Sequence, residues 1–151
     1  MDLHIDDFYR DTAAGLLMLY QAFPRKVALY VEDLIGHEEP DEFGLPSKRH
    51  QGCLGALLWL AEEGYLRFDS TIQYQALDQA ALTEKAFLRL TRSVPDLPAA
   101  TETLPSSVQR VHASLAHQLR EALKSGNSER LAGLARLLLE SGPLPARHDI
   151  A

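Results

Sequence analysis

The segment His37-Glu38-Glu39-Pro40-Asp41-Glu42-Phe43-Gly44 holds one imidazole and four carboxylates within a short stretch. Both groups are metal ligands, so the first chemistry to consider is metal binding. The spacing matches no known ligand pattern for zinc or calcium, and the proline and glycine are typical of a loop. We therefore interpret this segment as a solvated acidic loop and expect no metal site in it.

The residues that carry catalysis in other proteins do not form a recognisable motif in this chain. The sequence has no P-loop, no G-x-G-x-x-G after a strand, no G-x-S-x-G and no H-E-x-x-H. His112 and His117 are five residues apart, so on one continuous helix they point in different directions and do not chelate one metal. Cys53 lies among apolar residues, which favours a buried thiol over a nucleophile. We expect no enzymatic activity and no cofactor.

The net charge is negative and unevenly distributed. The 151 residues carry a net charge of −6, with a balance of −7 over residues 1–98 and +1 over residues 99–151. Nucleic-acid binding draws most of its affinity from Lys and Arg that neutralise phosphates. The acidic balance therefore counts against a strong nucleic-acid binder, although a local basic cluster can act within an acidic protein.

The start of the chain and its apolar segments predict a cytoplasmic protein outside the membrane. The first seven residues are acidic, whereas a secretory signal opens with positive charge and an apolar stretch. No apolar run approaches the roughly 18 residues that span a bilayer. A single cysteine cannot form an internal disulfide, which agrees with a reducing compartment.

The spacing of apolar residues and the positions of capping residues, proline and glycine predict the elements of the N-terminal half. A first helix is expected over residues 6–23, with Thr12 as its N-cap or an earlier start near Asp6 or Asp7. Pro24 ends it. A short strand and a short helix that ends at Gly36 are then expected over residues 26–29 and 30–35.

A second long helix is predicted after the acidic loop, with Ser47 as its N-cap and Gly64 at its end. Its apolar face is expected to hold Leu54, Leu57, Leu58 and Ala61, with Cys53 and Leu60 beside it. A hairpin over residues 65–82 should follow, with residues 72–77 as extra rungs or as a middle strand. Thr83 then caps a short helix.

The C-terminal half is predicted to be a linker and a helical hairpin. Residues 94–105 contain three prolines and indicate a linker. One helix should run from a cap at Ser106 or Ser107 to Gly126, and another from a cap at Ser128 to Gly142. The broad apolar face of this hairpin, residues 106–143, must be buried against the first domain or another subunit.

The segment from Leu57 to Ala86 resembles part of the winged helix-turn-helix superfamily of transcription regulators. The matching residues are Leu57-Leu58-Trp59-Leu60-Ala61-Glu62-Glu63-Gly64-Tyr65-Leu66-Arg67-Phe68 and Leu82-Thr83-Glu84-Lys85-Ala86. With the first helix, the resemblance covers roughly residues 6–92 and identifies no single family. It implies a winged-helix domain over residues 1–93 with a small β-hairpin wing. With the C-terminal two-helix hairpin added, the expected fold class is mainly α (α+β).

The resemblance also implies a nucleic-acid-binding site. In that fold the third helix lies in the major groove of double-stranded DNA, led by its N-terminal residues. The matching positions are Ser47, Lys48, Arg49 and Gln51. Lys48 and Arg49 would hold phosphates, and Arg49 and Gln51 would reach base edges. A homodimer formed through the C-terminal helices would place two such helices on a two-fold operator.

The chain departs from this pattern in its charges. Wing tips of DNA-binding members carry Arg or Lys, whereas residues 69–79 contain neither and include Asp69 and Asp78. The alternative is a winged helix that binds a protein partner within a larger complex. Trp59 bears on this choice, because it either packs under other helices, which we favour, or marks a protein contact. Gly52 and Gly55 indicate the close approach of another backbone, or chance.

Overall fold

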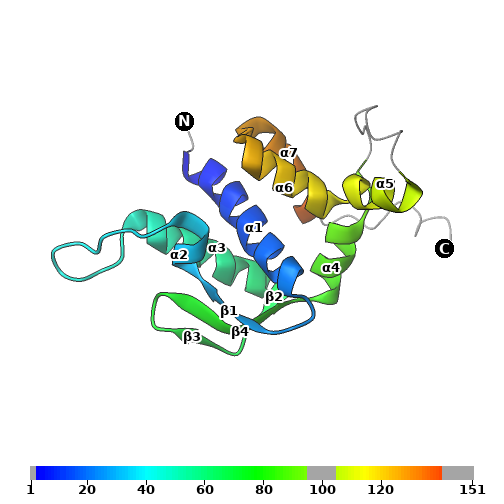
Figure 1. Cartoon of the computed structure of the whole chain (residues 1–151). Coiled ribbons are helices and arrows are strands. Elements are labelled where there is room, and N and C mark those ends of the chain that lie inside the picture. The colour runs from blue at the N-terminus through cyan, green and yellow to red at the C-terminus, as the bar shows by residue number, and fades with distance from the viewer. Residues whose placement is uncertain (1–2, 95–104, 141–151) are drawn as a thin grey trace.

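The computed structural model describes residues 3–94 and 105–140, which form a mainly helical structure with one small antiparallel sheet (Figure 1). The prediction of a mainly helical α+β chain is confirmed. In chain order the elements are α1 (Leu3–Ala22), β1 (Val27–Tyr30), α2 (Val31–Ile35), α3 (Lys48–Glu62), β2 (Leu66–Arg67), β3 (Ser70–Ile72), β4 (Ala76–Leu82), α4 (Glu84–Thr91), α5 (Ser106–Ala113), α6 (Leu115–Ser125) and α7 (Ser128–Leu139). None of the helices in these ranges is both long and apolar enough to cross a bilayer.

The sheet is built around β4, which pairs antiparallel with each of the other three strands. The strand order is β1-β4-β2, and β3 continues the line of β2 along β4. The returning strand of the predicted hairpin is thus longer than residues 79–82 and begins at Ala76. Residues 72–77 were expected to add rungs to the hairpin or to form a middle strand. Both occur, because Ile72 ends the strand β3 and pairs with Ala76 of β4.

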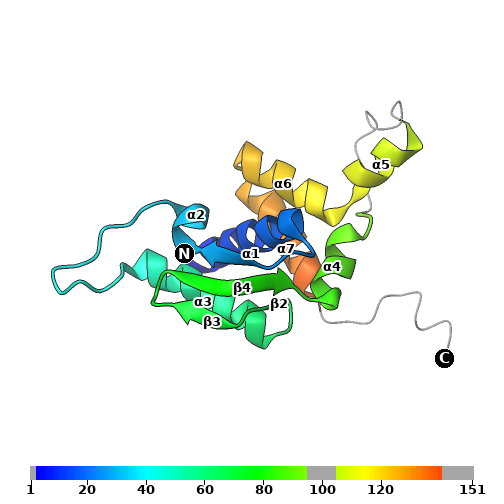
Figure 2. The same cartoon turned by 60° about the horizontal axis from the view of Figure 1, so that its bottom comes forward.

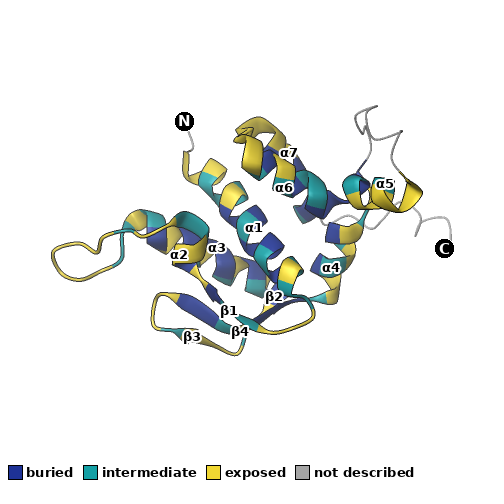
Figure 3. Cartoon of the chain, in the orientation of Figure 1, coloured by how far each residue is buried: buried dark blue, intermediate teal, exposed yellow. Residues whose placement is uncertain are grey.

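Helix α1 lies at the centre of the fold, between the sheet and α3 on one side and α6 and α7 on the other (Figure 2). Leu16 and Leu19 are fully buried there, as Figure 3 shows for the inner part of this helix. The helix begins at Leu3, so Thr12 is a buried mid-helix residue and its prediction as the N-cap is wrong. The alternative of an earlier start, near Asp6 or Asp7, is closer to the observed start. Packing of α1 against α3 and α7 outweighs the local capping preference of Thr12.

Helix α3 has the ends that the sequence predicts but a rotated inner face. Ser47 caps it by accepting a hydrogen bond from the His50 N–H, and Gly64 follows it with a φ of 83°. The Gly64 and Tyr65 N–H groups donate to the Ala61 and Leu60 carbonyls, which is the Schellman arrangement. The buried side chains are His50, Cys53, Ala56, Leu57 and Leu60. The expected stripe through Leu54, Leu58 and Ala61 is only half-buried, because α1 and the sheet cover the neighbouring side.

The first predicted C-terminal helix is divided into α5 and α6 at Ser114. The Ser114 hydroxyl accepts from the His117 N–H and so caps α6. The N–H of Leu115 donates to the Arg92 carbonyl at the end of α4. This N–H is therefore not available for the backbone hydrogen bond that a continuous helix would need. Because of this break, the rings of His112 and His117 stack with centroids 4.4 Å apart, and the expectation that they point apart is wrong.

The other helix ends of the C-terminal half agree in part with the sequence. Gly126 ends α6 in the left-handed conformation, as predicted. Asn127, not Ser128, caps α7, and the residue that precedes α5 is Pro105. Residues 95–104 of the predicted linker 94–105 and the stop at Gly142 lie outside the described residues.

Helices α6 and α7 form the expected antiparallel pair, and both pack on α1. Leu119 and Leu138 are fully buried in this packing. Polar contacts close the end of α7, where the Tyr65 hydroxyl donates to the Leu139 carbonyl and Arg89 donates to the Leu138 carbonyl. Arg92 donates to the carbonyl of Leu137. The sequence left two possibilities for what covers the apolar face of this hairpin, the first domain or another subunit. In the described residues, helix α1 of the same chain covers it.

The environment of His117 predicts that stability depends on pH. The pKa of His117 is lowered, first by burial and then by the neighbouring His112. At His117 the unfolded chain therefore binds more proton than the folded chain just below a pH of about 6.5. The contribution of His117 to the free energy of unfolding should fall as pH decreases through this value, and His117→Gln should remove that contribution from the slope measured in urea titrations. The exposed His4, changed to Gln, provides the control; an unchanged slope in His117→Gln would contradict the prediction.

Candidate functional site

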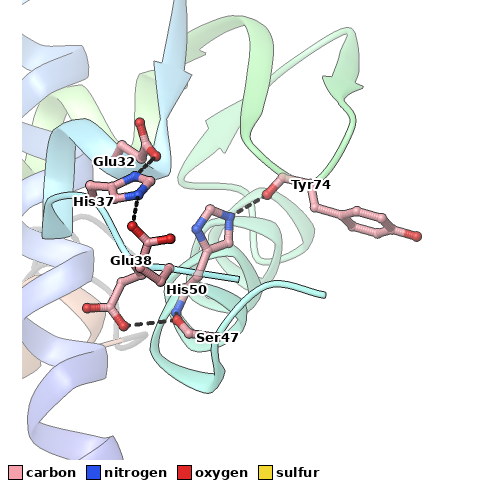
Figure 4. A network of polar contacts seen from close by, with 7 residues as sticks. Glu32, His37, Glu38, Ser47, His50 and Tyr74 are labelled. Carbon is pink, nitrogen blue, oxygen red and sulfur yellow. Dashed lines mark hydrogen bonds and ion pairs between the residues drawn. The ribbon is translucent and has the colours of Figure 1, made fainter. Parts of the chain in front are cut away.

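The first turn of α3 is held by polar contacts from two directions (Figure 4). The Ser47 hydroxyl donates to a carboxylate oxygen of Glu38 at 3.0 Å, which ties the helix start to the acidic loop. On the other side, the buried ring of His50 contacts the Tyr74 carbonyl through Nε2 at 2.6 Å. Since a carbonyl only accepts, Nε2 carries the proton. The acidic loop and the tip of the β3–β4 hairpin therefore flank the head of α3.

Arg49 is engaged inside the protein. Its two terminal nitrogens donate to the two carboxylate oxygens of Asp11, each at 2.7 Å. Asp11 lies on α1 with only 2% of its surface exposed, and Asp7 lies 3.8 Å from the Arg49 Nε. The hydrogen bonds to Asp11 raise the pKa of Arg49 and outweigh the opposing effect of burial. A guanidinium held in this bidentate way is not available to a phosphate or a base.

The other residues predicted to contact nucleic acid differ in whether their side chains already have a partner within the protein. The Gln51 side chain donates to the Pro46 carbonyl at 2.8 Å, and Ser47 is occupied by its capping bond and by Glu38. Lys48 is exposed and makes no ion pair or hydrogen bond within the described part of the chain. The four residues thus lie together at the head of α3, but Lys48 is the one whose charged group faces solvent without a partner there.

The solvent-facing side of α3 is weakly charged. We call it the outer face of α3, and it consists of Lys48, Gln51, Gly52, Gly55, Trp59 and Glu62. A side chain at either glycine would meet no other atom within 4 Å, so the close approach offered as one explanation of them is not made within the described residues. Gly52 and Gly55 leave a shallow strip of exposed backbone on this helix, each at a cost of about 1 kcal/mol relative to Ala.

Trp59 is the large apolar residue of the outer face. Its indole is 40% exposed and meets the ring of Phe8 edge-on, with centroids 5.3 Å apart. The expected packing under another helix is therefore made on one edge only, against α1. Ile5 lies one turn before Phe8 on that helix and is 41% exposed. The Phe8–Trp59 contact thus joins the exposed apolar side chains of α1 and α3.

The acidic loop is internally bonded and carries a second exposed aromatic. Within it, His37 binds Glu32 and Glu39 through its two ring nitrogens, and these carboxylates, Glu32 first, raise the pKa of His37. The described ranges contain no group of three or more ligands suited to a metal ion. Asp41 accepts from the N–H groups of the nearby residues 43 and 45, and Phe43 at the loop tip is 78% exposed.

Cys53 lies on the inner face of α3 and is fully buried, as the sequence predicts. Burial, together with the nearby carboxylate of Asp11, raises the pKa of the thiol to about 12. The thiolate that nucleophilic chemistry requires is therefore strongly disfavoured at neutral pH.

Sequence reasoning missed two residues that shape this site, Asp11 and Phe8. Asp11 is 38 positions from Arg49, and a lone aspartate in a helix carries no signal that names its partner. Comparison of the chain with family models, with curated proteins and with solved structures found no match. The site must therefore be interpreted from its own geometry.

Replacing Arg49 should destabilise the fold far more than replacing its neighbour Lys48. Arg49→Met leaves the buried Asp11 carboxylate without its cation, at an expected cost of about 3–5 kcal/mol. Lys48→Ala removes an exposed side chain and should change the free energy of unfolding by no more than about 0.5 kcal/mol. Urea unfolding measures both. Equal effects of the two variants would show that the Arg49–Asp11 pair does not join α1 to α3.

Proposed function

We propose that this chain is a cytoplasmic winged-helix protein that acts as a protein-interaction module within a larger complex. The element order supports the winged-helix assignment, because three helices with a strand between the first two precede a hairpin. The strand order β1-β4-β2 supports it as well, since the last hairpin strand lies between the other two. The α6–α7 pair then adds to the packing on α1.

The observation that carries the proposal is the composition of the outer face of α3. A DNA-reading helix presents cations and polar side chains to the groove. Here the face presents Gly52, Gly55 and a half-exposed Trp59, while Arg49 is turned inward to Asp11. Exposed tryptophan on a fixed support is typical of the centre of a protein interface, where it fills a pocket of the partner.

The charges around this face describe the partner. Glu62 and Glu63 are exposed at the C-terminal end of α3, and the acidic loop lies beyond its N-terminal end. A partner with an apolar pocket surrounded by Lys or Arg side chains complements both features, and the opposite charges would speed association. A phosphate backbone on the same face would meet these carboxylates and be repelled.

A photo-crosslinking amino acid at position 59 tests this proposal in the cell. We expect p-benzoylphenylalanine in place of Trp59 to capture one protein. The same amino acid in place of Leu88, which is 53% exposed on α4, should not capture that protein. With the purified partner, Trp59→Ala should weaken binding about 30-fold, as for an interface hot spot of about 2 kcal/mol.

Leu88→Ala is the matched control for affinity, because it also removes an exposed apolar side chain. Equal capture from the two positions, or a Trp59→Ala affinity within about twofold of the wild type, would contradict an interface at α3.

The second candidate function is a transcription regulator that binds double-stranded DNA as a homodimer through its C-terminal helices. The observation in its favour is Lys48, which is exposed and unpartnered within the described residues at the head of α3. A cation there suits a backbone phosphate, and Ser47 and Gln51 lie beside it.

DNA binding is best tested with Lys48→Ala, because Arg49→Ala would also disturb the α1–α3 contact. For a regulator, Lys48→Ala should weaken binding of a native genomic fragment and reduce the salt slope by about one. Fluorescence anisotropy at low salt measures this, and Arg25→Ala, at an exposed position outside α3 and the C-terminal helices, is the control. A wild-type protein that binds no genomic fragment under these conditions would exclude this second candidate.

A further inference from the structure

A shallow hollow on the sheet gathers two cations far apart in the sequence. It has a volume of about 450 Å³ and is lined by Lys26, Arg67, Phe68, Asp69 and Gln79. Lys26 immediately precedes β1, Gln79 belongs to β4 and Arg67 to β2, so the strand order β1-β4-β2 places the three side by side. All three are exposed.

The backbone at the centre of this row is irregular. Between the pairs Val27–Ala80 and Leu29–Leu77, β4 contains one more residue than β1, which is a β-bulge. Within the bulge, Gln79 adopts a φ of 56°, in the left-handed region that a non-glycine residue enters at an energetic cost. Bulges redirect side chains and occur often beside functional sites. Here the bulge places a polar amide group at the hollow between the two cations.

The charges that line the hollow are not satisfied by the protein. Lys26 and Arg67 form no ion pair within residues 3–94 and 105–140, although an aspartate also lines the hollow. Two positive groups that face the same small space repel each other, and a single anion between them would remove that cost. Against these two cations stands one carboxylate, that of Asp69, so the lining keeps a net positive charge.

We propose that this hollow binds an oxyanion group of the phosphate class. Arg67 offers a planar set of donors that matches two phosphate oxygens, and Lys26 adds a compact charge. The Gln79 amide supplies a neutral donor, and the ring of Phe68 forms part of the wall. The group belongs either to a small phosphorylated compound or to the backbone of a nucleic acid. This site is separate from the outer face of α3 and does not depend on the function proposed for that face.

The test uses the full chain and amide NMR spectra at low ionic strength, with two probes. Inorganic pyrophosphate represents the free compound, and a short DNA duplex of mixed sequence represents the backbone phosphate. We expect the amide signals of Asp69 and Gln79 to move on titration with at least one probe. Lys26→Ala/Arg67→Ala should weaken that binding about tenfold or more, because charge-assisted hydrogen bonds are lost. Asp69→Asn should strengthen it, because a repelling carboxylate is removed.

The matched control is Lys124→Ala/Arg136→Ala, which removes the same number of charges from exposed positions on α6 and α7. Pyrophosphate binding that only the Lys26/Arg67 double variant loses identifies a small phosphorylated ligand. Duplex binding alone, lost in the same variant, identifies a nucleic-acid backbone. Unmoved signals with both probes, or equal loss in the control, would overturn the proposal. Both double variants alter exposed residues, so their NMR spectra should remain those of a folded chain.

Discussion

The ion pair between Asp11 and Arg49 is the constraint on which the arrangement of the two central helices depends. A carboxylate that is 2% exposed requires a cation with good geometry, and two 2.7 Å bonds to one guanidinium provide it. Because Arg49 is in the first turn of α3, the pair sets the rotation of that helix against α1. Cys53, Leu57 and Leu60 then point inward, and Gly52, Gly55 and Trp59 face outward. This contact and the burial of the apolar side chains together determine which side of α3 is exposed.

That rotation leaves few cations on the exposed side of α3. The same helix carries one lysine that is free within the described residues, a tryptophan and two glycines, with carboxylates at and beyond its ends. Such a surface offers a large aromatic side chain for desolvation and, within the described residues, a single free cation for phosphate neutralisation. The sheet hollow with Lys26 and Arg67 has the opposite character, so the molecule separates its apolar surface from its basic one.

Capping residues and apolar spacing predicted many of the helices and their ends. Contacts between residues far apart in the sequence could not be predicted. Ser47, Gly64, Thr83 and Gly126 mark helix ends correctly because capping involves only neighbours a few positions away. Ser114 was missed as a break, since its effect needs the Arg92 carbonyl from another helix. The four candidate residues at the head of α3 do lie together, yet the partner that occupies Arg49 is a distant aspartate in α1. Apolar spacing predicted α3 but not which of two adjacent stripes would be inside, because that depends on which elements cover it.

Polar contacts at the end of α7 tie the C-terminal helices to the first half of the chain. Tyr65 at the exit of α3 and two arginines at 89 and 92 all donate to the last carbonyls of this helix, so segments from the middle of the sequence complete its C-terminus. Helices α6 and α7 pack against one side of α1. The buried core is therefore shared, because residues of the N-terminal part and of the C-terminal helices belong to one cluster. A shared core of this kind is expected to unfold cooperatively, so the exposed tryptophan and the basic hollow should be lost together when the chain unfolds.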